Sequence, residues 1–145
     1  MIQDLYKTDF NSWIVAQTNS LRNGDIEALD LDNLIEEIES MASSEERELH
    51  SRFVSIMAHM LKLMCEPTSY ATSGWRKEID SYRASTLHIL KRQAKLKAHA
   101  QDFVDDAYQI ARLEAVKGSE CSVDDFPDTC PWTAEQLFQK GFYGN

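Results

Sequence analysis

The 145-residue sequence lacks the features that mark several common classes of protein. It has no long apolar run, so no transmembrane span is expected, and its first residues do not resemble a secretory signal. Its three cysteines, Cys65, Cys121 and Cys130, are odd in number and show no Cys-x-x-Cys spacing. Neither a disulfide framework nor a zinc knuckle is therefore expected, and a reducing cytoplasm is the compartment that fits best.

Motifs for cofactor and metal chemistry are also missing from the sequence. It contains no glycine-rich phosphate loop, no Gly-x-Ser-x-Gly elbow and no His-Glu-x-x-His. A di-iron site in a helical bundle needs Glu-x-x-His, but the residues three positions before the four histidines are Arg47, Ile56, Ser85 and Leu96. We therefore expect no cofactor and no metal ion.

Basic residues are fewer than acidic ones, with 15 Lys and Arg against 24 Asp and Glu. Because contact with phosphates needs clustered Lys and Arg, nucleic-acid binding is not expected as the main function. Residues 27–48 hold nine acids and one base, whereas residues 76–97 hold seven bases and two acids. This division indicates two segments that neutralise each other or face different partners, and it leaves nucleic-acid binding by residues 76–97 as a third interpretation.

One long helix is predicted from Asp30 to Cys65, because apolar residues recur there at steps of three and four. Pro67 ends it, and the pair Ser43–Ser44 marks the expected place for a bend or break. The apolar stripe predicts a buried face covered by other helices, with Ile38 and Phe53 in the core. The stripe consists of Leu31, Leu34, Ile35, Ile38, Met41, Ala42, Leu49, Phe53, Ile56, Met57, Met60 and Met64.

Further helices are predicted from Thr8-Asp9 to Leu21, from Ser73 to about Gln93 and from about Leu96 to Gly118. The pattern Thr133-x-x-Gln136 predicts a capping box for a short last helix through Phe138. Strand-like alternation is absent. The sequence therefore predicts a single all-α domain over residues 1–145, folded as an antiparallel bundle of four main helices with a short C-terminal helix.

A polar seam runs beside the apolar stripe of the long helix. It comprises Glu45, Glu48, Arg52, Ser55 and His59, spaced three, four, three and four residues apart. Arg83 on the next helix is expected to reach Glu45 or Glu48. Charges beside a packed stripe are partly desolvated and need partners. Two interpretations stay open: a closed ionic network that fixes helix register, or a catalytic or ligand-binding cleft.

Several motifs resemble those of a known bacterial family. The most specific are Leu34-Ile-Glu-Glu-Ile-Glu-Ser-Met41, with Glu36, Glu37 and Glu39, and Cys130-Pro131-Trp132-Thr133; Tyr6-x-x-Asp9-Phe10-x-x-Trp13 and Ser73-x-Trp75 lie before and between them. The chain resembles the family catalogued as domain of unknown function 29, abundant in cyanobacteria, over nearly its whole length. The family usually has glycine where this chain has Ala42, which favours a straighter helix here. The resemblance implies an all-helical fold and assigns no activity.

Two functional hypotheses from different classes follow. The first is a non-enzymatic interaction module that engages another protein or a second copy through its unevenly charged surface and its methionine-rich face, Met41, Met57, Met60 and Met64. The second is an enzyme or small-ligand binder that uses Glu45, Glu48, Arg52 and His59 with Arg83. No membrane association is expected from either.

Overall fold

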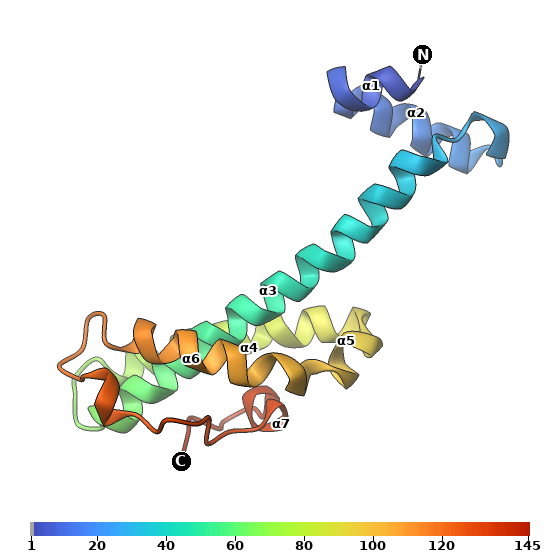
Figure 1. Cartoon of the computed structure of the whole chain (residues 1–145). Coiled ribbons are helices and arrows are strands. Elements are labelled where there is room, and N and C mark those ends of the chain that lie inside the picture. Colours follow the sequence, from blue (N-terminus) through green and yellow to red (C-terminus); the bar gives the residue numbers. More distant parts are fainter. Residues whose placement is uncertain (1) are drawn as a thin grey trace. The chain divides into compact units, whose positions relative to one another are not determined.

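A computed structural model describes residues 2–145, apart from the side chain of Ala42. In this range the chain forms seven α-helices, three short 3-10 helices and no strand, which confirms the all-α class (Figure 1). The elements are α1 (Ile2–Thr8), α2 (Phe10–Arg22), η1 (Ile26–Ala28), α3 (Leu31–Cys65), α4 (Thr72–Arg92), α5 (Ala94–Ala98), η2 (Ala100–Phe103), α6 (Val104–Ala115), η3 (Val123–Asp125) and α7 (Ala134–Phe138). The bundle of four main helices stays a prediction. Among the described helices, none combines the length and the apolar character needed to span a bilayer.

The chain folds as two compact units, Met1–Ser44 (unit 1) and Glu45–Asn145 (unit 2). Helix α3 contributes its residues up to Ser44 to unit 1 and the remainder to unit 2. The helix is unbroken at Ser43 and Ser44, so the break that their poor helix propensity suggested does not occur. The boundary between the units nevertheless follows directly after this pair. The single domain predicted from the sequence stays a prediction, and the units are described in turn.

Unit 1 is held together mainly by aromatic contacts and a buried polar group. Asp9 separates α1 from α2 and caps α2, because its carboxylate accepts a hydrogen bond from the Ser12 amide. The ring of Tyr6 on α1 contacts the ring of Trp13 on α2, with 4.9 Å between centroids. Gly24 ends the turn after α2 with a φ of 69°, a conformation that glycine adopts without steric cost.

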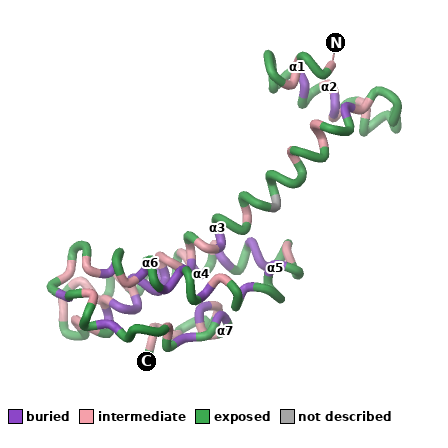
Figure 2. The backbone as a smooth tube through the Cα atoms, in the orientation of Figure 1, coloured by how far each residue is buried: buried purple, intermediate pink, exposed green. Residues whose placement is uncertain are grey.

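Unit 2 contains the hydrophobic core of the described chain (Figure 2). Twenty-three buried apolar side chains form one cluster, drawn from the second half of α3, from α4 to α7 and from the loops between them. Phe53 of α3 is fully buried, and its ring lies 5.7 Å from the ring of Phe138 at the end of α7. The predicted capping box at Thr133 and Gln136 is confirmed and fixes the start of α7.

The apolar stripe of α3 is buried only in its second half, so the prediction of one continuous buried face is wrong. Leu49, Phe53, Ile56, Met57 and Met60 are fully buried. In the first half, Leu31, Ile35, Ile38 and Met41 are exposed, and Ala42 lies outside the described side chains. Helical periodicity shows that a helix has an apolar face, but it does not show whether another element of the chain covers that face.

Candidate functional site

The acidic members of the polar seam are paired with arginines, but not with the arginine that the sequence suggested. Glu45 of α3 accepts a hydrogen bond of 2.9 Å from Arg92 at the end of α4. Glu48 pairs with Arg52 one turn further along α3, at 3.5 Å. The expected reach of Arg83 to either acid is wrong, because Arg83 has other partners.

Arg52 connects the seam to α4. Its Nε donates a hydrogen bond of 3.2 Å to Ser85 Oγ, and its guanidinium lies 5.6 Å from the centre of the Tyr82 ring. Together with the contact to Glu48, these interactions engage both the charge and the planar face of the guanidinium. Arg52 is thus held by groups from both α3 and α4.

Arg83 is buried in unit 2 and is 2% exposed. Its Nε donates to the carbonyl oxygen of Leu137 at 2.8 Å, and its Nη2 donates to that of Phe142 at 2.7 Å. Burial lowers the pKa of this guanidinium, and the negative charge of Asp80 opposes that effect. Two backbone carbonyls are thus satisfied by one buried cation. Arg83 therefore ties α4 to the C-terminal segment.

His59 is the one titratable member of the seam that lines an open groove. The groove has a volume of about 390 Å³, and its polar lining includes Ser55, Lys62, Tyr82 and Glu114. His59 Nδ1 lies 2.7 Å from the carbonyl oxygen of Ser55, which the protonated ring nitrogen can reach as a donor. That contact leaves Nε2 as the acceptor nitrogen of a neutral ring. The structure thus separates His59 from the paired acids of the seam.

The acidic family motif lies in unit 1, and its three glutamates have different surroundings. Glu37 accepts a hydrogen bond of 2.5 Å from the hydroxyl of Tyr6, which raises the pKa of Tyr6 to about 12. Glu36 and Glu39 are exposed. The hydrogen bond of Glu37 therefore ties α1 to α3.

The aromatic family positions lie in or beside the core of unit 2. Trp132 is buried, its indole N–H donates to the carbonyl of Gly144 at 3.3 Å, and its ring meets that of Tyr108 edge-on. Trp75 is partly buried against the same core, and Pro131 is exposed. Trp132 therefore anchors its loop to the core, whereas Pro131 stays at the surface.

A buried carboxylate at the start of the predicted long helix joins the segments of unit 1. Asp30 is buried, and its Oδ2 accepts hydrogen bonds from the indole of Trp13 at 3.0 Å and from the side-chain amide of Asn33 at 2.7 Å. The Asp30 backbone amide donates to the side chain of Gln17 at 2.8 Å. A single acid thereby joins α2 to the start of α3. In the sequence, an aspartate directly before an apolar helical run marks Asp30 as the start of a helix. It does not identify Trp13, Gln17 or Asn33 as its partners.

An exposed apolar surface lies on the first half of α3. We call Leu31, Ile35, Ile38 and Met41 the unit 1 face; these residues are 54%, 52%, 64% and 66% exposed. They are spaced four, three and three residues apart and so occupy one side of the helix. The predicted methionine-rich face is not a continuous surface, because Met57 and Met60 are fully buried.

The cysteines differ from the expectation of no disulfide. Cys65 and Cys121 form a disulfide across 56 residues of sequence. This pairing weakens the argument for a reducing compartment that rested on cysteine number. Cys130 is free, and burial raises the pKa of its thiol, which disfavours the reactive thiolate.

The described residues form an all-α protein with a seam whose acids pair with arginines and with an exposed apolar face on the first half of α3. A family model covers residues 5–143, so the chain belongs to the family described as Domain of unknown function DUF29. This finding confirms the resemblance that the acidic and Cys-Pro-Trp-Thr motifs indicated. No curated protein and no solved structure matches the chain.

Proposed function

We propose that this protein is a non-enzymatic interaction module whose unit 1 face binds a basic amphipathic helix of another protein. The observation that carries the proposal is the exposure of four large apolar side chains on one side of α3. Each of Leu31, Ile35, Ile38 and Met41 is more than half exposed. Contiguous apolar surface of this kind is typical of binding sites, because leaving it in water is unfavourable.

The spacing of the unit 1 face matches the way in which one helix recognises another. Anchors at steps of three and four residues project from one side of a helix and pack between the side chains of a partner helix. From Leu31 to Met41 the face is about 15 Å long, at 1.5 Å of rise per residue. It therefore offers about three turns of contact to one partner helix.

Charge selects the kind of partner. Residues 2–44 hold nine acids and two bases, and Asp32, Glu36 and Glu39 are exposed on the same stretch of α3 as the unit 1 face. Lysine or arginine beside an apolar ridge would be attracted to these carboxylates. A second copy of the same face would bring like charges together, so the charge pattern favours a different, basic partner.

The seam offers less support for the rival proposal of an enzyme or small-ligand binder. Its acids are paired with Arg92 and Arg52, and Arg83 is buried among carbonyl groups. Of the titratable members of the seam, His59 alone lines the groove, which it shares with Lys62, Tyr82 and Glu114. Its described hydrogen bond goes to the backbone carbonyl of Ser55 and not to an acid or a nucleophile, the partners that general acid–base chemistry uses.

A peptide titration tests the proposal. The probe is a labelled amphipathic helical peptide with leucine at steps of three and four and lysine beside them, and fluorescence anisotropy reports binding to the full chain. We expect Ile35→Asp and Ile38→Asp each to weaken binding by about tenfold or more, because each places a carboxylate in an apolar contact. Leu113→Asp is the matched control, since Leu113 is exposed on α6 in unit 2.

Two results would contradict the proposal. One is equal binding of a second peptide in which glutamate replaces every lysine, because charge would then not select the partner. The other is a dimer of the chain itself that light scattering detects and that Ile38→Asp abolishes, which would make a second copy the occupant. Rising salt should weaken the binding of the lysine peptide, since the flanking charges are exposed and screened.

The proposed setting is the bacterial cytoplasm: the family resemblance implies a bacterium, and the odd number and the spacing of the cysteines favoured a reducing compartment. In that compartment the Cys65–Cys121 pair would be held mainly as two thiols. Cell fractionation of the native host, with the protein followed by antibody, tests this location.

A further inference from the structure

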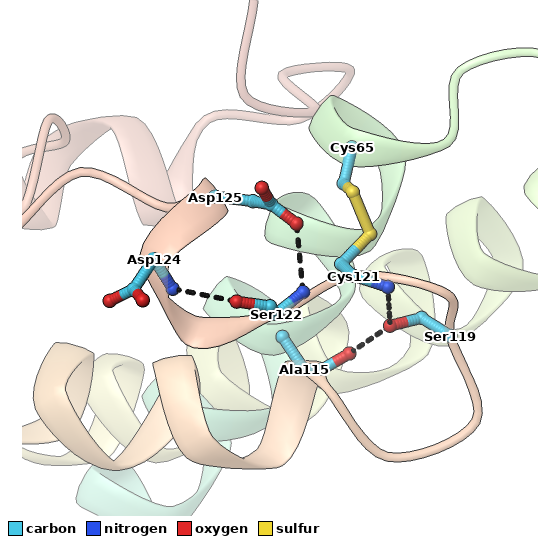
Figure 3. Close-up of a disulfide and its surroundings, with 7 residues drawn as sticks. All are labelled: Cys65, Ala115, Ser119, Cys121, Ser122, Asp124 and Asp125. Carbon is cyan, nitrogen blue, oxygen red and sulfur yellow. Dashed lines mark hydrogen bonds between the residues drawn. A yellow bond between two sulfur atoms is a disulfide. The ribbon is translucent and has the colours of Figure 1, made fainter.

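Three potential metal ligands come together beside the end of α3, from segments far apart in the sequence. Cys65 is the last residue of α3, whereas Cys121 and Asp125 belong to the loop and 3-10 helix that follow α6. One ligand atom from each, the two sulfurs and a carboxylate oxygen, lies within 4.8 Å of the others. Figure 3 shows the carboxylate of Asp125 on the same side of the loop as the two sulfurs.

The backbone around these groups is fixed by hydrogen bonds. Ser122 N donates to Asp125 Oδ2 at 2.8 Å, and the hydroxyl of Ser122 accepts from the amide of Asp124 in return (Figure 3). The amide of Cys121 donates to Ser119 Oγ, whose own hydroxyl donates to the carbonyl of Ala115. The hydrogen bond from Ser122 orients the Asp125 carboxylate and leaves its second oxygen available to bind a metal. In metal sites, residues that do not touch the metal often orient the ligands in this way.

The ligand set fits a particular class of metal. Two thiolates with a carboxylate suit zinc, which takes sulfur at about 2.3 Å and oxygen at about 2.0–2.2 Å in tetrahedral geometry. Calcium and magnesium prefer oxygen ligands alone. In a tetrahedral site two thiolates stand about 3.8 Å apart, a separation that follows from those bond lengths.

The protein backbone permits that separation. The Cα atoms of Cys65 and Cys121 are 6.4 Å apart, towards the upper end of the range that a disulfide spans. Rotation of the two side chains can therefore part the sulfurs without moving the helix or the loop. Asp125 is exposed, so the metal can enter from solvent and a water molecule can occupy the fourth position.

We propose that the reduced protein binds Zn²⁺ through Cys65 Sγ, Cys121 Sγ and one carboxylate oxygen of Asp125, and that the disulfide is the metal-free form. A dithiol reductant supplies the change. It gives two electrons and two protons to the protein sulfurs, which become thiols, and leaves as its own disulfide. Zinc then displaces both protons to solvent as it binds the thiolates. Zinc binding is thereby coupled to the redox state of the pair.

The sequence predicted no metal because metal motifs are recognised by their local spacing. Cys65 and Cys121 are separated by 56 residues, and no Cys-x-x-Cys or histidine pair marks either segment. Only the packing of the loop after α6 against the end of α3 brings the three groups together.

Cobalt provides the test, because Co²⁺ occupies zinc sites and shows thiolate-to-metal absorption. The full chain is reduced with a phosphine, freed of metal and titrated with CoCl₂, and ZnCl₂ is then added to displace the cobalt. We expect a near-ultraviolet charge-transfer band and visible bands typical of tetrahedral geometry. Cys65→Ser and Cys121→Ser should abolish the charge-transfer band, whereas Cys130→Ser, which keeps both ligand thiols, should retain it.

Asp125→Asn and the oxidised wild type keep the test decisive if a cysteine variant fails to fold. Loss of a residue that only hydrogen-bonds to a metal ligand weakens metal binding by roughly tenfold or more. Asp125→Asn removes a direct ligand, so it should weaken zinc binding by at least that factor. The oxidised protein should show no thiolate band. A reduced wild type without that band, or an Asp125→Asn protein with unchanged zinc affinity, would overturn the proposal.

Discussion

The two units of this protein differ in how much apolar surface they bury. Unit 2 buries twenty-three apolar side chains in one cluster, and five large apolar residues of its described chain are exposed. Among the residues of unit 1 that the structure describes, one large apolar side chain, Trp13, is buried and nine are exposed, among them Phe10 and Ile38. Segments of about 40 residues seldom fold on apolar burial alone. Unit 2 therefore has a buried core of its own, whereas unit 1 leaves most of its large apolar side chains exposed, and the proposed partner helix would cover part of them.

The largest expected effect separates the two halves of α3. Phe53→Ala should lower the free energy of unfolding by about 3–5 kcal/mol, because it leaves a cavity in the core of unit 2. Ile38→Ala, on the same helix, should change it by no more than about 0.5 kcal/mol, since Ile38 is exposed. Urea unfolding followed by circular dichroism measures both. Similar losses from the two variants would show that the first half of α3 is also buried.

Removal of the buried cation of unit 2 should have the next largest effect. Arg83→Met should cost about 2–4 kcal/mol, because the carbonyls of Leu137 and Phe142 lose a charged donor while remaining in a partly dry setting. Lys91→Met on the same helix is the control, since Lys91 is exposed. Thermal unfolding compares the two variants. An unchanged melting temperature for Arg83→Met would mean that water replaces the guanidinium.

A buried acid should matter locally in unit 1. Asp30→Ala removes the acceptor for the Trp13 indole and the Asn33 amide, which should cost about 1–3 kcal/mol of local stability. Amide hydrogen exchange should accelerate in α2 and leave the core of unit 2 unchanged. Asp32→Ala, at an exposed acid on the same segment, is the control. Acceleration across both units would show that they unfold together.

The smallest effect concerns the seam. A double-mutant cycle on Glu45 and Arg92 should give a coupling of about 0.5–1 kcal/mol, because the pair is in contact but Arg92 is more than half exposed. Glu48 and Arg83 should be additive, since Arg83 bonds to carbonyl groups instead. A Glu48–Arg83 coupling as large as that of Glu45 and Arg92 would restore the pairing that the sequence suggested.

Local sequence signals predicted α2, α3, α4 and α7, but they missed α1 and the separation of α5 from α6. The period of apolar residues, Pro67 after α3 and the capping box at Thr133 are properties of short segments, so they can be read without the fold. The all-α class follows from these signals, whereas the family was indicated by the acidic motif and the Cys-Pro-Trp-Thr motif.

The contacts between segments could not be predicted in the same way. The prediction that Ile38 lies in the core is wrong because periodicity defines a face but not its covering. The prediction of an acidic partner for Arg83 is wrong, because Arg83 binds the backbone carbonyls of Leu137 and Phe142. Every residue has a backbone carbonyl, so no residue type in the sequence marks such a partner. The pairing of Cys65 with Cys121 depends on loop packing over 56 residues.

Hydrogen exchange of the wild-type chain, with and without the lysine-rich amphipathic peptide, tests the central claim most directly. If the unit 1 face takes a basic helix, the peptide should slow exchange in α2 and in α3 up to Ser44 and leave α4 and α6 unchanged. Protection confined to the groove beside His59 in unit 2, with none in unit 1, would contradict the account.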